Sequence, residues 1–130
     1  MLKKTITFKD FLGIEKKRDY YFHLSKAELM EMEIGTSGGY LEMIQKIIDA
    51  QDNAQLMTVF KEFVLKAYGE ISPDGERFIK VDDNGRKLAD KFVETEAYSI
   101  LFMELVGDAD AFANFVNGII PADLAEKVAE

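Results

Sequence analysis

The sequence contains no cysteine, and this absence removes several classes of site at once. There is no disulfide framework, no thiolate nucleophile and no cysteine-ligated zinc site. A cysteine-free chain suits a reducing cytoplasm, although the absence alone does not establish one. Histidine is nearly as scarce. The only one, His23, lies among aromatic residues in an expected strand, where a packed or surface imidazole is more common than a catalytic base or a metal ligand.

Long apolar runs are also missing. No stretch approaches the roughly 20 apolar residues that a membrane-spanning helix requires. The N-terminal lysines are followed by the alternating segment Thr5–Asp10 rather than by the apolar core of a signal peptide. We therefore expect neither a membrane partner nor a secretion signal.

Basic residues are fewer than acidic ones, and they are unevenly distributed along the chain. The net charge is −8, so phosphate repulsion disfavours nucleic acid as the main partner. Residues 1–20 hold six basic and three acidic residues, a net of +3, and the remainder holds ten basic and 21 acidic residues, a net of −11. Two interpretations fit: a solvated hairpin beside a soluble acidic body, or the basic end of one copy docking on the acidic body of another.

The overall composition predicts one folded domain. The chain has 130 residues, of which 48% are hydrophobic and 12% aromatic, enough to bury a core. We predict an α+β fold that is mainly α-helical, with a single domain over residues 1–130. An N-terminal β-hairpin (1–24) precedes a helical body (25–121) of about five to six helices with one short extended segment, and a polar tail (122–130) follows.

The predicted hairpin comes from two short patterns. Lys3–Asp10 alternates, with Ile6 and Phe8 on one side, which is typical of a half-buried strand. Gly13 permits the turn, and the aromatic segment Arg18–Leu24 forms the second strand. A lone hairpin is only marginally stable in water, so this one must pack on the helices or on another subunit.

The central stretch combines a helix, a turn and an extended segment. Asp52 is the predicted N-cap of the helix, and Gly69 is its predicted C-terminal cap. Ser72–Gly75 then forms a turn, because proline presets φ and glycine tolerates positive φ, and Arg77–Lys80 is extended. The apolar positions of this helix recur at spacings of three and four: Leu56, Val59, Phe60, Phe63, Val64 and Ala67.

Other local signals place the remaining helices. Ser25 and Glu28 are spaced for a reciprocal capping box at a helix start, and Asp108 can cap the last helix, which we expect Gly118 to end. The predicted helices outside the central stretch cover residues 25–34, 40–51, 86–94, 95–106 and 108–118.

No motif for chemistry stands out. Gly35–Gly39 leaves a helix and is not followed by a G-K-[ST] sequence, so it is a loop rather than a phosphate-binding loop. The acidic turn Val81–Gly85 fails the EF-hand register, because Lys80 occupies the position of the first acidic ligand. No hydroxyl nucleophile has a motif around it, and the carboxylates are scattered over helix exteriors. We therefore expect no catalytic residue, no metal site, no cofactor and no enzymatic activity.

Two helices carry apolar residues outside their core-facing stripe. Leu65 points away from the stripe of the central helix, and Ile100 and Met103 lie on the back and the flank of the 95–106 helix. Ordinary burial in one core and a partner or oligomer surface are both compatible with this pattern. The residues that we expect to contact partners are Met57, Leu65, Tyr68, Phe78, Ile100 and Met103.

Four sequence blocks carry a family resemblance. They are F-x-L-S-K-A-E-L-M-E-M-E at Phe22–Glu33, F-K-E-F-V-L-K-A-Y-G-x-I-S-P-D-G-x-R-F-I-K at Phe60–Lys80, F-x-x-T-E-A-Y-S-x-L-F-M-E-L at Phe92–Leu105 and F-x-N-G-I-I-P at Phe115–Pro121. Together, and in this order over nearly the whole chain, they resemble the tail assembly chaperones of long-tailed bacteriophages and prophages of Gram-positive hosts. None of the four blocks is a catalytic motif.

The resemblance implies a function that composition does not reveal. It implies a non-enzymatic chaperone that binds the tape measure protein, keeps this long helical protein soluble, recruits the major tail tube protein and then dissociates. Such a protein, a candidate homo-oligomer, would act in the host cytoplasm during assembly and be absent from the mature virion. Two other classes stay open: a structural tail or neck protein retained in the virion, and a small bacterial adaptor domain.

Overall fold

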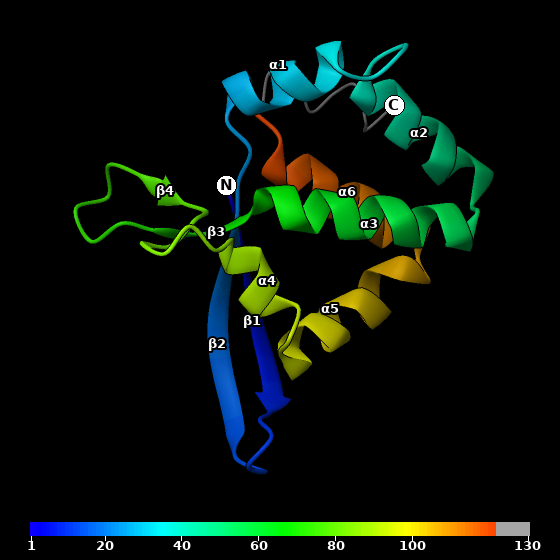
Figure 1. Cartoon of the computed structure of the whole chain (residues 1–130). Helices are drawn as coiled ribbons and strands as arrows, with labels where there is room; N and C mark the ends of the chain where they lie inside the picture. Colours follow the sequence, from blue (N-terminus) through cyan, green and yellow to red (C-terminus); the bar gives the residue numbers. More distant parts are fainter. Residues whose placement is uncertain (122–130) are drawn as a thin grey trace.

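The computed structural model describes residues 1–121 (Figure 1), so the expected tail at 122–130 lies outside the described residues. The described residues form four strands and six helices. They are β1 (Leu2–Lys9), β2 (Glu15–Phe22), α1 (Lys26–Ile34), α2 (Tyr40–Ala50), α3 (Asn53–Ala67), β3 (Tyr68–Ile71), β4 (Phe78–Ile79), α4 (Leu88–Phe92), α5 (Glu96–Val106) and α6 (Ala109–Ile119). The predicted α+β, mainly helical fold with an N-terminal hairpin is confirmed.

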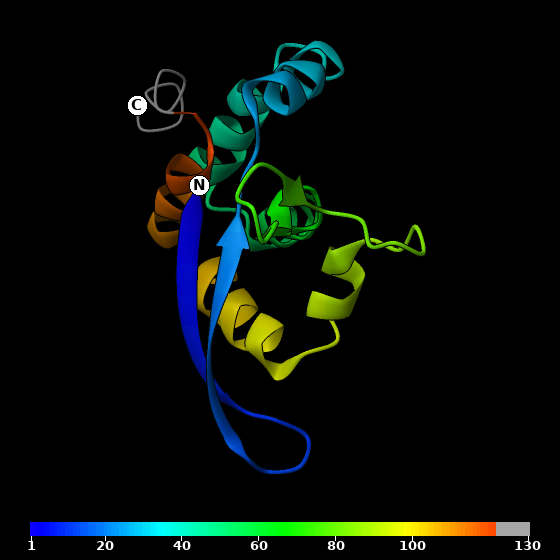
Figure 2. The same cartoon turned by 90° about the vertical axis from the view of Figure 1, so that its left-hand side faces the viewer.

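The N-terminal hairpin is long and projects from the body. Strands β1 and β2 pair antiparallel along their full length. The carboxylate of Asp10 accepts hydrogen bonds from the backbone N–H groups of Leu12 and Ile14, each at 2.9 Å, and Gly13 has a φ of 81°. In both views of the molecule the turn of the hairpin lies past the helices (Figures 1 and 2). Its base packs on the body, because α5 and α6 both contact β1.

The central helix ends earlier than predicted. Asp52 caps α3 as expected, since its carboxylate accepts from the backbone N–H groups two and three residues on, at 3.0 and 3.2 Å. The helix stops at Ala67, and Tyr68 already has an extended backbone (φ −69°, ψ 138°). Tyr68 pairs with Phe22 of β2 and begins β3. The prediction that Gly69 ends the helix is therefore wrong: Gly69 is a buried strand residue.

The strands β3 and β4 enlarge the hairpin into a sheet. The predicted turn between them is confirmed: the Ser72 hydroxyl donates to the Asp74 carboxylate at 2.6 Å, and Gly75 has a φ of 77°. The resulting four-stranded sheet has the order β1-β2-β3-β4, each neighbouring pair antiparallel. The extended segment predicted after the turn is thus β4, at the edge of this sheet.

The core gathers around α3, which contacts α2, α4, α5 and α6. Its apolar stripe is buried as predicted, and Phe60 has no exposed surface. Helix α4 joins the sheet to this core, because the ring of Phe92 stacks on Tyr68 with 4.5 Å between the centroids. The last helix differs from the prediction: Gly118 does not end α6, which continues to Ile119.

The predicted capping box at α1 is confirmed and can be tested. The Ser25 hydroxyl accepts from the Glu28 N–H at 3.1 Å, and the Glu28 carboxylate accepts from the Ser25 N–H at 3.0 Å. We expect Ser25→Ala to lower the free energy of unfolding by about 1 kcal/mol, measured by urea denaturation. The control is Ser99→Ala, at an exposed position of α5, which should change stability by less than about 0.5 kcal/mol. Equal stability of Ser25→Ala and the native chain would contradict a stabilising role for the box.

Candidate functional site

Four of the six residues expected to contact partners remain at the surface. Their exposed fractions are 39% for Met57, 39% for Leu65, 42% for Ile100 and 75% for Met103. The first two lie on α3 and the last two on α5.

The other two residues expected to contact partners, Tyr68 and Phe78, are buried or half-buried. Tyr68 is only 8% exposed, because the chain leaves α3 before it and seats its ring in the aromatic core. As folded, Tyr68 offers little surface to a partner. Phe78, in β4, is half-buried, with its ring edge-on to that of His23 at a centroid distance of 5.6 Å. Burial lowers the pKa of His23, so this imidazole is neutral at pH 7.

Leu65 lies in a groove between α1 and α3, with a volume of about 450 Å³. We call it the α1–α3 groove. Its apolar lining comes from both helices, from the segment between β2 and α1 and from the segment after β4: Met32, Leu65, Leu24 and Val81. Its charged residues are Glu28, Glu31, Lys66, Lys80 and Lys87. An apolar strip between charged edges is the surface that an amphipathic helix recognises.

The walls of the α1–α3 groove are held together by one lysine. The Lys80 ammonium group donates to the Glu28 carboxylate and to the backbone carbonyl of Lys66, both at 2.7 Å. Burial alone would raise the pKa of Glu28, but the hydrogen bond from Lys80 holds it below its usual value. The Glu28 carboxylate is therefore ionised at neutral pH. The contacts of Lys80 join α1, α3 and the segment after β4, which keeps the groove in shape.

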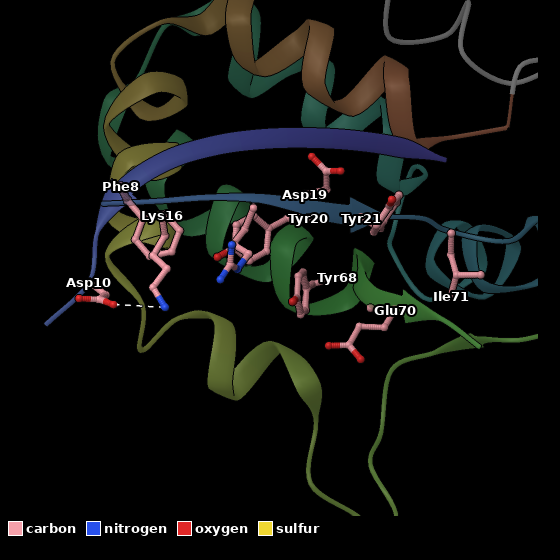
Figure 3. A pocket seen from close by; sticks show the side chains of 11 residues that line it. Phe8, Asp10, Lys16, Asp19, Tyr20, Tyr21, Tyr68, Glu70 and Ile71 are labelled. Atoms are coloured by element: carbon pink, nitrogen blue, oxygen red, sulfur yellow. Dashed lines mark ion pairs between the residues drawn. The ribbon is translucent and has the colours of Figure 1, made fainter. Parts of the chain in front are cut away.

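A second hollow, which sequence reasoning missed, lies between the hairpin and β3 (Figure 3). Its volume is about 620 Å³, and the rings of Tyr20 and Tyr68 lie in it with 6.3 Å between their centroids. Burial raises the pKa of Tyr20, and burial together with the nearby Glu70 charge raises that of Tyr68 to about 12, so both phenols are neutral at pH 7. Only the β2–β3 pairing reveals this hollow, since the sequence pattern placed Tyr68, the first residue of β3, at the end of the central helix.

Sequence reasoning also missed the exposure of the hairpin turn. Phe11, Leu12 and Ile14, which we call the hairpin tip, are 77%, 85% and 53% exposed. The signal was present, because a turn between two strands usually carries polar residues and this one carries three large apolar side chains. A cluster of this kind at the surface is typical of an interaction site.

A metal site and a membrane-spanning helix are both absent from residues 1–121. Within residues 1–121 no group of three or more His, Cys, Asp or Glu residues is arranged to hold a metal ion. None of the helices described here is both long and apolar enough to cross a membrane. The groove and the hairpin tip instead present apolar area framed by charge, which is the chemistry of contacts between proteins.

Comparison with known proteins connects the chain as a whole to a biological process. A family model described as phage tail assembly chaperone matches residues 1–130, the whole chain. No curated protein and no solved structure matched the chain. Tail assembly chaperones are a non-enzymatic kind of protein whose work involves other proteins of the tail during assembly. The chain belongs to the phage tail assembly chaperone family.

Proposed function

We propose that this chaperone binds the tape measure protein of its phage through the α1–α3 groove and keeps it soluble before the tail forms. The observation that carries the proposal is the half-exposed Leu65 in an apolar strip with charged edges. A long helical protein that has not yet been enclosed by its tube exposes apolar helix faces to water. Seating such a face in the groove would cover it without any chemical step.

The size of the groove implies that one copy binds weakly. A volume of about 450 Å³ accommodates a few side chains of a helix rather than its whole surface. Many copies along one tape measure chain would give strong overall binding, and each weak contact could still be released. The chaperone, as a homo-oligomer, would then recruit major tail tube subunits and dissociate as they replace it.

The proposed function also implies when and where the protein acts. Its net charge of −8 suits a coat that keeps the complex dispersed. It would act in the host cytoplasm during assembly and leave before the virion matures. A structural tail or neck protein would instead remain in purified particles in fixed stoichiometry, and mass spectrometry of those particles separates the two.

The groove can be tested by one substitution in phage-producing cells. A tagged chain is pulled down, and its partners are identified by mass spectrometry. We expect the native chain to capture the tape measure protein and Leu65→Glu to capture at least about tenfold less, because a charged side chain replaces a leucine that becomes buried on binding. Circular dichroism should show an intact fold, since Leu65 is already 39% exposed.

The matched control is Ile34→Glu, on α1. Ile34 is 80% exposed and does not line the groove, so this variant should capture the tape measure protein as the native chain does. If Leu65→Glu captures as much as the native chain, the groove is not the binding site. If the native chain captures no tape measure protein, or is a stoichiometric component of particles, the proposed function is wrong.

A further inference from the structure

The hairpin tip is a rigid apolar projection that the fold of one chain does not use. The turn is ordered by hydrogen bonds at both ends: the backbone N–H of Asp10 donates to the carbonyl of Ile14, and that of Gly13 donates to the carbonyl of Asp10, both at 2.9 Å. This framework holds Phe11 and Leu12 in water, at 77% and 85% exposure. The turn lies past α5 in both views (Figures 1 and 2), so the tip is free to enter a surface of another molecule.

The charges around the tip are mainly basic. The strand residues next to it include Lys9, Lys16, Lys17 and Arg18, against two acidic residues in the same stretch, Asp10 and Glu15. The Asp10 carboxylate is engaged with the turn itself and lies 3.4 Å from the Lys16 ammonium group. A partner that suits this projection therefore has an apolar patch in an acidic setting.

The same chain carries a surface of that description on α5. Glu96, Ile100 and Met103 are spaced by four and three residues, so they share one face, and all three are exposed. The stretch from 92 to 121 contains five acidic residues and no Lys, Arg or His. We call the exposed face at these three residues the α5 face. Strand β1 of the same chain contacts α5 at the edge of this face, where Lys4 pairs with Glu104 at 2.9 Å, and Glu96, Ile100 and Met103 stay exposed.

We propose that the hairpin tip of one copy docks on the α5 face of a second copy. Phe11, Leu12 and Ile14 would cover Ile100 and Met103, and the basic strand residues would lie near the acidic ones. Because the two surfaces differ, one end of an assembly still has a free tip and the other a free α5 face, so the contact repeats head to tail. The inference deepens the proposed function, which requires many adjacent copies, by naming the contact between them.

Two complementary variants test this contact. Leu12→Asp disables the tip, and Met103→Asp disables the α5 face. We expect the native chain to form assemblies that grow beyond a dimer with concentration in sedimentation velocity experiments at high micromolar concentration. Each variant alone should associate about ten- to a hundredfold more weakly, because a buried apolar side chain is replaced by a charge. Both positions are highly exposed, so thermal melting should not change.

Mixing the two variants is the decisive measurement. The first still has an intact α5 face and the second an intact tip, so the mixture should form 1:1 dimers that do not grow further. Ile34→Asp, which removes an exposed apolar residue elsewhere, should behave like the native chain. A native chain that stays monomeric, a native dimer that does not grow, or a mixture that stays monomeric would each overturn the inference.

The contact between copies and the binding of the tape measure protein can succeed or fail independently in these experiments. Leu12→Asp leaves Leu65 and the rest of the α1–α3 groove unchanged. A monomeric native chain that still captures the tape measure protein would defeat the head-to-tail contact and leave the groove in place. Normal head-to-tail assembly without such capture would defeat the groove and leave the contact in place.

Discussion

Replacing Phe60 with alanine should lower the free energy of unfolding by about 3–5 kcal/mol, the cost typical of deleting a fully buried aromatic side chain. Phe60 has no exposed surface and lies where α3, α5 and α6 meet. Its ring contacts four others, at centroid distances from 5.5 to 6.4 Å: Tyr98, Phe102, Phe112 and Phe115. These four rings are held on two other helices, α5 and α6, and cannot close together over the space left, so a cavity should remain.

Urea denaturation followed by circular dichroism measures this loss. The matched control is Phe11→Ala, because Phe11 is 77% exposed and its removal should change the free energy of unfolding by less than about 0.5 kcal/mol. Since domains of this size are stabilised by about 5–15 kcal/mol, the Phe60 variant should be close to its stability limit. Similar losses for the two variants would contradict the assignment of Phe60 to the centre of the core.

Gly69→Ala should destabilise the protein by about 1–3 kcal/mol, although it adds a single methyl group. A Cβ at this position would lie 2.5 Å from the backbone carbonyl oxygen of Ile79 and 2.6 Å from the ring of Phe78. The ring can rotate away, but the carbonyl belongs to β4 and moves only with its strand. We therefore expect faster hydrogen exchange in β3 and β4, together with a lower urea midpoint. Gly107→Ala is the control, since a Cβ there has no neighbour within 4 Å.

The same substitution should weaken partner binding indirectly. Lys80 follows Ile79 directly, and its ammonium group holds Glu28 and the Lys66 carbonyl in the walls of the α1–α3 groove. Displacing β4 should loosen those bonds, so Gly69→Ala is expected to lower both stability and capture of the tape measure protein. Leu65→Glu should lower capture alone. Unchanged hydrogen exchange in β3 and β4 would show that the sheet accepts the methyl group without moving.

The two proposed tasks use different parts of one small fold. The groove binds a partner helix, and the hairpin tip binds a neighbouring copy. The groove is built from α1, α3 and the segment after β4, whereas the proposed contact between copies uses the hairpin and α5. Because the two sets of residues do not overlap, a copy could hold a partner helix and two neighbouring copies at the same time. Such an arrangement allows weak individual contacts to add up along a long chain.

Local chemistry determined much of this structure from the sequence alone. The Ser25 capping box, the Asp52 cap and the turn at Gly75 each depend on residues within a few positions of one another, so the sequence specifies them before any tertiary contact forms. The position of Leu65 and Ile100 off the core stripe also followed from spacing, whereas the structure decided that both are exposed rather than buried.

Only the tertiary structure decided what happens after Ala67. The apolar pattern permits α3 to continue to Gly69, but pairing with Phe22 of β2, far away in the sequence, makes Tyr68 the first residue of a strand. That pairing buries Tyr68, requires glycine at position 69 and creates the hollow beside the hairpin. Periodicity reports only a residue's near neighbours, whereas strand pairing and the shape of a groove depend on segments that meet when the whole chain folds.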